Sequence, residues 1–404
     1  MKLTAPAACG VMALALVGTL TACGHGTSGS SSSDGITIGA SIPLSGTLAS
    51  FGSFEKWGYQ HAVDAVNKTG GIKIGGVKRK VKLIILDDQT DPNRTVNNVQ
   101  RLITSDHVDA LLGSCTDSLV EPGALIADRA GVPLVTGCAA TNTFGTTKKW
   151  KWAWDLFFNS DQLTETPFNT IDELGLKTNK KVAILHSNGK NENVIGGEEW
   201  PKWAAKHGFT VVYNAAFPPD TSQFSSALAK IKATGADVLL SVFGPPSSIA
   251  LRKQMVSAGY SPKMTVMEEG AEPVQFATAL GRLANGVMVG GYWDPSFPYA
   301  GAKTLTAEFE VQTHQTSSQH IADTSTAAQI LIDAITRAGT TDKAKVNAEI
   351  GRTDATYVVG RIKFGADHTA TLPMVEDQWH NGKTVVIAPA KEATGKVLFP
   401  LPTG

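Results

Sequence analysis

The segment Lys181-Val-Ala-Ile-Leu-His186 is a strand-like run of apolar residues, and Asp237-Val-Leu-Leu-Ser-Val-Phe243 repeats this pattern further along the chain. Between them, a helical pattern passes through Trp200–His207, a second strand-like run covers Phe209–Tyr213, and another helical pattern lies near Ser222–Thr234. Strands that alternate with helices of this length form parallel sheets that helices cover on both faces. The segment therefore predicts an α/β fold.

The same alternation covers the first part of the chain. Its strand-like runs are Ile36–Ile42, Val81–Leu86, Ala110–Gly113 and Val132–Thr136. The helical patterns between them are Phe54–Asn67, Thr95–Ser105 and Leu119–Ala130. The glycine-rich run Gly70–Gly76 follows a helical pattern and not a strand, so we interpret it as a turn and not as a nucleotide-binding loop.

Length and charge exclude several classes of protein. The 404 residues carry 36 Lys+Arg and 36 Asp+Glu, a balance that argues against nucleic-acid binding, which needs a basic face. The length predicts two or three domains. Four cysteines are too few for a disulfide-dense scaffold and leave little for a thiolate zinc site.

The N-terminus predicts export. An apolar run, Ala7–Leu20, is shorter than a transmembrane helix. It ends in Leu20-Thr-Ala-Cys23, which resembles a bacterial lipobox, so we expect a lipoprotein signal peptide at 1–22 and acylation of Cys23. A generic signal peptide that contains a cysteine is the alternative. Residues 23–35 are polar and predict a flexible tether, which places the protein on the extracytoplasmic face of the membrane, held by lipid.

Parallel sheets bind ligands outside the carboxyl ends of their strands. The segments that follow the predicted strands are rich in Ser, Thr, Gly and Asn: 41–51, 114–118, 137–141, 187–195, 244–248 and 268–270. They predict a site for a small polar ligand at this edge of the sheets.

Several motifs together resemble the Leu/Ile/Val-type (branched-chain amino-acid) periplasmic binding proteins. They are Ile42-Pro-Leu-Ser-Gly46 with Phe51-Gly52, Val66–Ile72, Leu86–Pro92, Phe224–Asp237 and Leu251–Tyr260. The similarity runs from Ile36 to about the C-terminus. It implies the type I periplasmic-binding-protein fold, in which two Rossmann-like lobes with parallel sheets are joined by three crossovers. It also implies an extracytoplasmic receptor of an ABC importer.

The resemblance also implies where the lobes begin and end. The first lobe is expected at 36–155 and 293–360, and the second at 156–292 and 361–404. The crossovers are then expected near Trp154–Asn159, Tyr292–Phe297 and Val358–Ile362. Closure of the two lobes about this hinge would capture the ligand.

In this family, a Ser/Thr-rich turn and the next turn along the chain bind the ligand's α-carboxylate through hydroxyl and backbone N–H groups. The corresponding residues here are Ser114, Thr116 and Ser118 in the first turn and Cys138, Ala139, Ala140 and Thr141 in the second. Hydroxyls and free N–H groups at a helix start suit an anion. Alternatively, Thr116 or Ser118 only caps the following helix.

The resemblance assigns the rest of the ligand to other residues. Glu269 matches the acidic residue that binds the ammonium group, with a surface carboxylate as the alternative. Phe51 matches the position at which the family carries an aromatic residue over the ligand side chain. Alternatively, Phe51 is a hydrophobic staple at the start of a helix. Asn191 and Phe243 complete the predicted site, near the ends of two predicted strands.

Three departures from the family leave the ligand open. The segment Asn188–Asn193 lacks the family's tyrosine, and Phe243-Gly-Pro-Pro246 replaces another common aromatic position. Asp117 lies inside the carboxylate-binding turn, where its negative charge would repel an anion. An amino acid, an amide, a urea-like solute, an aromatic acid and a peptide fragment all remain candidate ligands.

The aromatic run Trp150–Phe158 lies near the first crossover. We interpret it as packing between the lobes, with stacking on a sugar or an aromatic ligand as the alternative.

The sequence favours a binding protein over an enzyme. Its nine histidines form no metal-ligand spacing, and no Gly-x-Ser-x-Gly elbow is present, so we expect no metal, no cofactor and no catalytic residue. The expected partners are a small-molecule ligand and a membrane permease, with the protein itself a monomer. A ligand-sensing receptor that acts through a partner is the alternative, and a secreted hydrolase is a weaker one.

Two cysteines remain once Cys9 is assigned to the signal peptide and Cys23 to the lipid. Cys115 and Cys138 follow consecutive predicted parallel strands, so their Cα atoms can lie close enough for a disulfide. Export permits the oxidation. Two buried thiols are the alternative.

Overall fold

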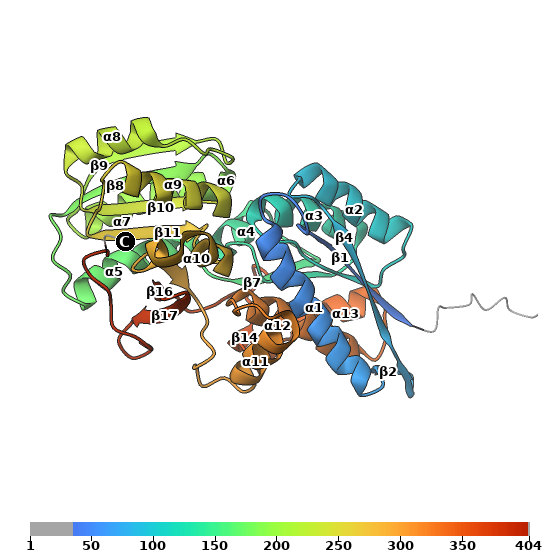
Figure 1. Ribbon diagram of the computed structural model, residues 1–404. Helices are drawn as coiled ribbons and strands as arrows, with labels where there is room; N and C mark the ends of the chain where they lie inside the picture. Colours follow the sequence, from blue (N-terminus) through green and yellow to red (C-terminus); the bar gives the residue numbers. More distant parts are fainter. Residues whose placement is uncertain (1–34, 403–404) are drawn as a thin grey trace, which may run out of the picture. The chain divides into compact units, whose positions relative to one another are not determined.

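Two large sheets organise residues 35–402, the part of the chain that the computed structural model describes (Figure 1). The predicted signal peptide, Cys23 and all but the last residue of the predicted tether lie outside these residues. Every strand pair in the first sheet is parallel. Its strands are, from edge to edge, β15 (Thr369–Thr371), β7 (Ala153–Phe157), β6 (Leu134–Thr136), β5 (Ala110–Leu112), β1 (Ile36–Ile42) and β4 (Val81–Asp87).

The second sheet has a parallel part and an antiparallel edge. The parallel strands are β9 (Thr210–Phe217), β8 (Lys181–Ser187), β10 (Val238–Phe243), β11 (Met264–Glu269) and β12 (Met288–Gly291). The strands β16 (Val375–His380) and β17 (Lys383–Ala388) follow as the antiparallel edge. The predicted α/β fold with parallel sheets is confirmed.

Helices cover both faces of each sheet. Around the first sheet lie α1 (Ala49–Lys68), α2 (Pro92–Thr104), α3 (Asp117–Ala130), α4 (Thr141–Thr147), α11 (Ala302–Thr313), α12 (His320–Ala338) and α13 (Lys343–Gly351). Around the second lie α5 (Ser160–Glu173), α6 (Lys190–Val194), the π-helix η1 (Ile195–Glu199), α7 (Trp200–Lys206), α8 (Ser225–Thr234), α9 (Pro245–Ser257), α10 (Val274–Leu280) and the short helix η2 (Gly281–Ala284). Although far apart in sequence, α1 and α12 pack side by side (Figure 1).

Two small hairpins complete the described residues. The first joins β2 (Ile72–Ile74) to β3 (Val77–Arg79), and the second joins β13 (Asp354–Tyr357) to β14 (Gly360–Lys363). The turn of the first hairpin is Gly75-Gly76, with φ of +58° and +87°, values that favour glycine. The glycine pairs at both ends of the run Gly70–Gly76 thus lie in turns, but Ile72–Ile74 between them forms a strand, which the prediction of a single turn missed.

The strands are apolar throughout because the sheets are buried on both faces. In β8, Val182 and Ile184 pack into the core that also contains α5 and α7. The alternating residues Ala183 and Leu185 pack into a separate core with α8, α9 and α10. Adjacent residues of one strand thus point to opposite faces, which matters for the site described below.

The sheet memberships show where the chain passes from one sheet to the other. The chain leaves the first sheet after β7 and leaves the second after β12. It returns to the second sheet only between β15 and β16, because Thr369–Thr371 pairs with Asp155–Phe157 in the first sheet. This third crossing lies further along the chain than the predicted boundary at 360/361.

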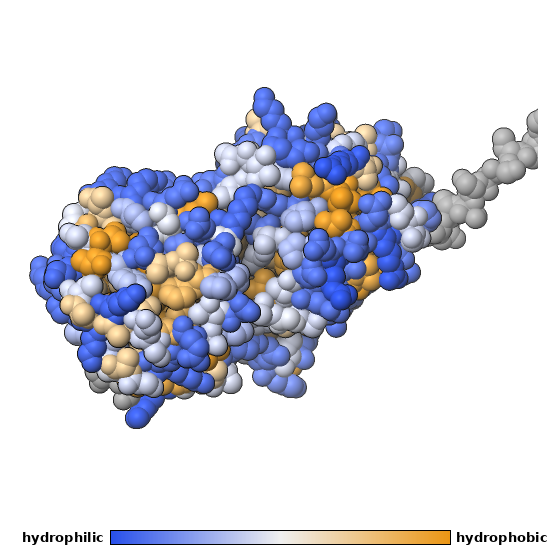
Figure 2. All heavy atoms as spheres, turned by 90° about the horizontal axis from the view of Figure 1, so that it is seen from above, coloured by the Kyte–Doolittle hydropathy of each residue, from blue (hydrophilic) through white to orange (hydrophobic). Residues whose placement is uncertain are grey.

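The surface is mostly polar, as the face in Figure 2 shows, with apolar atoms in scattered groups. The large apolar side chains that are exposed are Val77, Val256 and Val311. Among the described helices, none is both long enough and apolar enough to cross a membrane.

Candidate ligand-binding site

A cavity lies between the two sheets, and both contribute to its wall. The residues from the first sheet and its helices are Phe51, Cys115, Thr116, Asp117, Ser118, Cys138, Phe157, Phe158 and His320. The residues from the second are Leu163, Asn191, Glu192, Ile195, Val242, Glu268, Glu269 and Glu272.

An outer cleft adjoins this cavity. The two share Thr116, Ser118, Glu192 and Glu269 in their walls, so these side chains stand where the cleft meets the cavity. The wall of the cleft contains many Ser and Thr residues together with Leu48, Pro219 and Pro246. A small solute therefore has a route from the surface to the cavity.

The structure brings six of the predicted site residues to the cavity and leaves five elsewhere. The six are Phe51, Thr116, Ser118, Cys138, Asn191 and Glu269. The five that do not line it are Ser114, Ala139, Ala140, Thr141 and Phe243.

Each of the five is used inside the fold. The Ser114 hydroxyl donates to Asp88 Oδ2 at 2.9 Å, and the Thr141 hydroxyl donates to the carbonyl of Phe158 at 3.1 Å. Ala139 and Ala140 are buried in the turn that follows β6.

Phe243 does not line the cavity, because successive side chains of a strand point to opposite faces of the sheet. It packs with Phe217 and Phe224 in the core beneath α8 and α9. Its neighbour Val242 points to the opposite face of β10 and lines the cavity instead.

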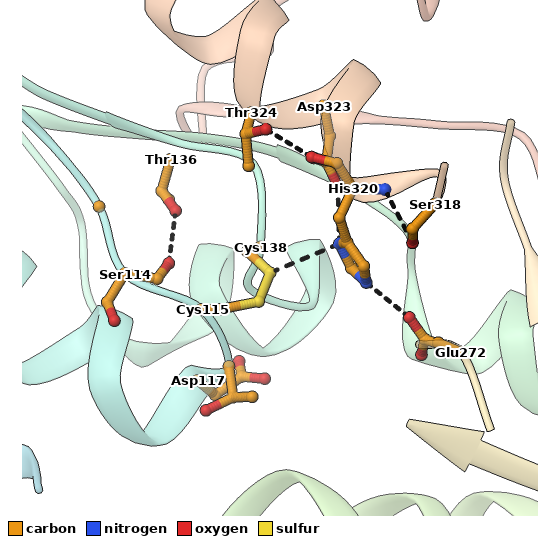
Figure 3. The surroundings of a disulfide bond; sticks show 12 residues. Ser114, Cys115, Asp117, Thr136, Cys138, Glu272, Ser318, His320, Asp323 and Thr324 are labelled. Atoms are coloured by element: carbon orange, nitrogen blue, oxygen red, sulfur yellow. Dashed lines mark hydrogen bonds and ion pairs between the residues drawn. A yellow bond between two sulfur atoms is a disulfide. The ribbon is translucent and has the colours of Figure 1, made fainter. Parts of the chain in front are cut away.

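Cys115 and Cys138 form a disulfide with Cα atoms 4.8 Å apart. It joins the turn after β5 to the turn after β6 and lies beside His320, as Figure 3 shows. His320 Nδ1 is 4.0 Å from Cys138 Sγ. Although these three residues lie close together, metal binding needs thiolates, and the disulfide leaves none here.

His320 is held between two carboxylates. Its Nε2 lies 2.7 Å from Glu272 Oε2, and its Nδ1 lies 3.2 Å from Asp323 Oδ2 and 2.9 Å from the Tyr292 hydroxyl. Burial opposes protonation of the ring, but Asp323 and Glu272 outweigh it and raise the pKa of His320 to about 10. The imidazolium is therefore charged at neutral pH and already paired on both sides.

Three carboxyl groups of the cavity are hard to ionise: those of Asp117, Glu268 and Glu269. Burial raises the pKa of Asp117 to about 7, with a further rise from Glu121. Burial and the nearby Glu272 raise the pKa of Glu268 to about 8, although both its oxygens accept from the Gly290 N–H at 3.0 and 3.1 Å.

Glu269 also resists ionisation. Burial, followed by the charges of Glu192 and Glu272, raises its pKa well above the usual range. Its backbone has φ +64°, in the left-handed region that costs energy for a residue other than glycine. Such backbone strain concentrates at functional sites. Here the strained residue is one whose side chain lies where the cleft meets the cavity.

The remaining wall is apolar and rich in aromatic rings. Phe157 and Phe158 pack against each other with centroids 4.2 Å apart, and Phe51 meets the His320 ring edge-on at 5.0 Å. Trp154, by contrast, stacks on His368 at 3.6 Å in the core beside the first sheet. Within the aromatic run, Trp154 therefore packs in the core, whereas Phe157 and Phe158 line the cavity.

Residues 35–383 match the model of the family described as periplasmic binding protein. The match covers well over half of the chain. The chain belongs to the periplasmic binding protein family. Among its curated relatives, Leu/Ile/Val-binding protein homolog 8 of Brucella abortus is 25% identical over 390 residues, which cover 90% of this chain and 93% of the relative.

Solved structures share the fold of this periplasmic binding protein. The branched-chain amino acid transporter substrate binding protein of Streptococcus pneumoniae, in complex with isoleucine, has a TM-score of 0.78 at 21% identity and covers 88% of this chain and 100% of its own. A solute binding protein of an ABC transporter from R. palustris, in complex with benzoate, has a TM-score of 0.76 at 19% identity. The match covers 87% of this chain and 95% of that protein. One fold therefore holds ligands of different charge.

Several cavity residues of this periplasmic binding protein were not predicted from the sequence. Glu268 adjoins the predicted Glu269, and an adjacent pair of acidic residues was the available signal. His320 carried no such signal, because α12 reaches the cavity from a distant part of the chain. Glu272 lies in the loop between β11 and α10, three residues after Glu269.

The ligand-free periplasmic binding protein is expected to lose stability as pH rises from 6 to 9. Asp117, Glu268, Glu269 and His320 all have raised pKa values, so the folded state holds more protons than the unfolded state. Their stabilisation is present at acidic pH and is lost as pH passes about 7, 8 and 10. We expect a fall of more than about 2 kcal/mol in the free energy of unfolding.

Urea denaturation at several pH values measures this fall, and Glu268→Gln should flatten the curve. A stability that rises between pH 6 and pH 9 would contradict these assignments.

Proposed function

We propose that this periplasmic binding protein is the extracytoplasmic receptor of an ABC importer, and that it captures a small polar solute between two lobes. The observation that carries the proposal is the cavity, whose wall comes from both sheets and opens to an outer cleft. The family membership supports it, and so do the amino-acid and ABC-transporter descriptions of the relatives.

The two lobes would correspond to the two sheets and their helices. We assign 36–157 and 293–371 to the first lobe, because β15 pairs with β7, and the rest of 158–402 to the second. Two ion pairs join the sides of the cleft: Glu272 with His320 at 2.7 Å and Glu121 with Lys190 at 2.6 Å. Closure about the three crossings would form these pairs around a bound solute.

Binding without chemistry agrees with the side chains that line the cavity. Thr116 and Ser118 share a hydrogen bond at 2.9 Å with each other. The one histidine in the wall is bonded to Glu272 and Asp323 and is not placed to activate either hydroxyl. We therefore propose a receptor, monomeric and held to the membrane through acylated Cys23, and not a hydrolase.

A thermal-shift screen of amino acids, amines, amides, aromatic acids and sugars, followed by calorimetry, tests the proposal. We expect one solute per chain, recovered chemically unchanged. Conversion of the solute would overturn the receptor function in favour of an enzyme.

Uptake separates an importer from a signalling receptor. Cells that lack this protein should lose uptake of the labelled solute. Unchanged uptake would favour the alternative of a ligand sensor that acts through a partner.

A further inference from the structure

We propose that the solute is a small organic cation with an apolar body and no carboxylate, and that the Asp117 side chain occupies the place where family members hold the carboxylate of an amino acid. The inference rests on the proposed receptor function and narrows its ligand. It is carried by the contacts of Asp117, by the charges around the cavity and by its aromatic wall.

Asp117 already fills the turn that was expected to bind the ligand's carboxylate. It is 3% exposed and begins α3. Its Oδ2 accepts from the backbone N–H of Ala140 at 3.4 Å, and its Oδ1 accepts from the Thr143 hydroxyl at 2.7 Å. A helix start and a free N–H would attract an anion, and here the protein places its own carboxyl group at that position.

Several other donors of the two turns are also engaged. The Thr116 N–H donates to the carbonyl of Cys138 at 3.0 Å, and the Thr141 N–H donates to the carbonyl of Phe158 at 2.9 Å. The hydroxyls of Thr116 and Ser118 bond to each other. The disulfide fixes the two turns together, so these donors are not released by a simple shift of one turn.

The charges around the cavity favour a cation. Among the described residues that line the cavity or the outer cleft, neither lysine nor arginine occurs. The acidic residues in these walls are Asp117, Glu192, Asp220, Glu268, Glu269 and Glu272. The single charged imidazole, His320, is balanced by Glu272 and Asp323. A ligand carboxylate would meet several carboxyl groups without a counter-ion, whereas an ammonium group would stabilise their ionised forms.

A buried acceptor in the wall also awaits a donor. Asn191 Oδ1 is buried and has no hydrogen-bond partner among the described residues. Buried polar atoms are nearly always paired, and an ammonium N–H would satisfy this one. The neighbouring Glu192 and Glu269 would supply the charge.

The apolar wall accounts for the rest of the ligand. Phe51, Phe157 and Phe158 present aromatic rings to the cavity. Aromatic faces attract cations and also bury hydrocarbon. Carboxylates together with aromatic rings therefore suit an amine that carries an aliphatic or aromatic group.

Calorimetry with matched probes tests the charge class. The probes are L-leucine, 3-methylbutylamine and 4-methylpentanoate, with L-phenylalanine, phenethylamine and 3-phenylpropanoate as a second set. The measurement is made at about pH 8, above the pKa of about 7 of Asp117. We expect each amine to bind about 100-fold tighter than its amino acid, and the acids to bind more weakly still.

Asp117→Asn then tests the role of that side chain. Removal of its charge should shift the preference by at least about tenfold toward the amino acids, whereas Glu198→Gln, at an exposed position, should leave it unchanged. An equal change for amine and amino acid would overturn the assignment of Asp117. If the variant does not fold, the wild-type probe series still decides the ligand class.

The outcomes separate this inference from the receptor function. Tighter binding of leucine or phenylalanine than of the amines would overturn the inference and leave the receptor proposal intact. Failure of every amine to bind would also overturn it. Chemical turnover of a bound probe would instead overturn the receptor function.

Discussion

Glu269→Gln is expected to weaken binding of an amine-bearing ligand by about 100-fold, which corresponds to ~2.7 kcal/mol. The bound ammonium would stabilise the ionised form of Glu269, whose pKa is raised by burial and by Glu192. Glutamine has the shape of the protonated acid but cannot ionise. The variant should therefore bind less tightly and release fewer protons on binding, as calorimetry in buffers of different ionisation enthalpy measures.

The same variant separates a binding role from a structural one. Because glutamine mimics the protonated side chain, the ligand-free protein should unfold at the same temperature or a higher one. Affinity for the uncharged 3-methylbutanol should be unchanged, and Glu198→Gln should behave as the wild type. Equal loss of affinity for the amine and the alcohol would contradict the role of Glu269 as the partner of the ammonium group.

Replacement of both Cys115 and Cys138 by serine is expected to lower the free energy of unfolding by about 3 kcal/mol. The disulfide closes a loop with a sequence separation of 23, so it restricts the unfolded chain. Urea denaturation followed by tryptophan fluorescence measures the change. Ligand affinity should fall as well, because the bond fixes the two turns that hold Asp117.

Reductant provides the control for this prediction. It should destabilise the wild-type protein and have no effect on the serine variant. If the wild-type protein, unfolded without reductant, reacts with a thiol reagent at both cysteines, the disulfide does not exist and the prediction fails.

The fold could be predicted because its signals are local. A strand such as Lys181–Ser187, buried on both faces, is apolar along its whole length. The helices between the strands show their own periodicity and end at glycine, as α3 does at Gly131. The strand Thr369–Thr371 was missed as a member of the first sheet because three residues carry too little pattern and their partner, β7, is far away in sequence.

The site could be predicted only in part because it depends on orientation as much as on position. Loop position identified Thr116 and Glu269 correctly as residues at the cavity. Within β10 the prediction chose Phe243, whereas Val242 lines the cavity, a difference of one residue that reverses the face. His320 could not be found, since only tertiary structure brings α12 beside the disulfide.

The path of the chain also sets an order for its biosynthesis. The first sheet takes its edge strand from Thr369–Thr371, and the second takes β16 and β17 from the residues that follow. A nascent chain therefore completes neither sheet before residue 371 has been made, and until then β7 and β12 remain unpaired edges, which are prone to aggregation. A truncation before Thr369 would consequently damage both sheets at once, although it removes only the last part of the sequence.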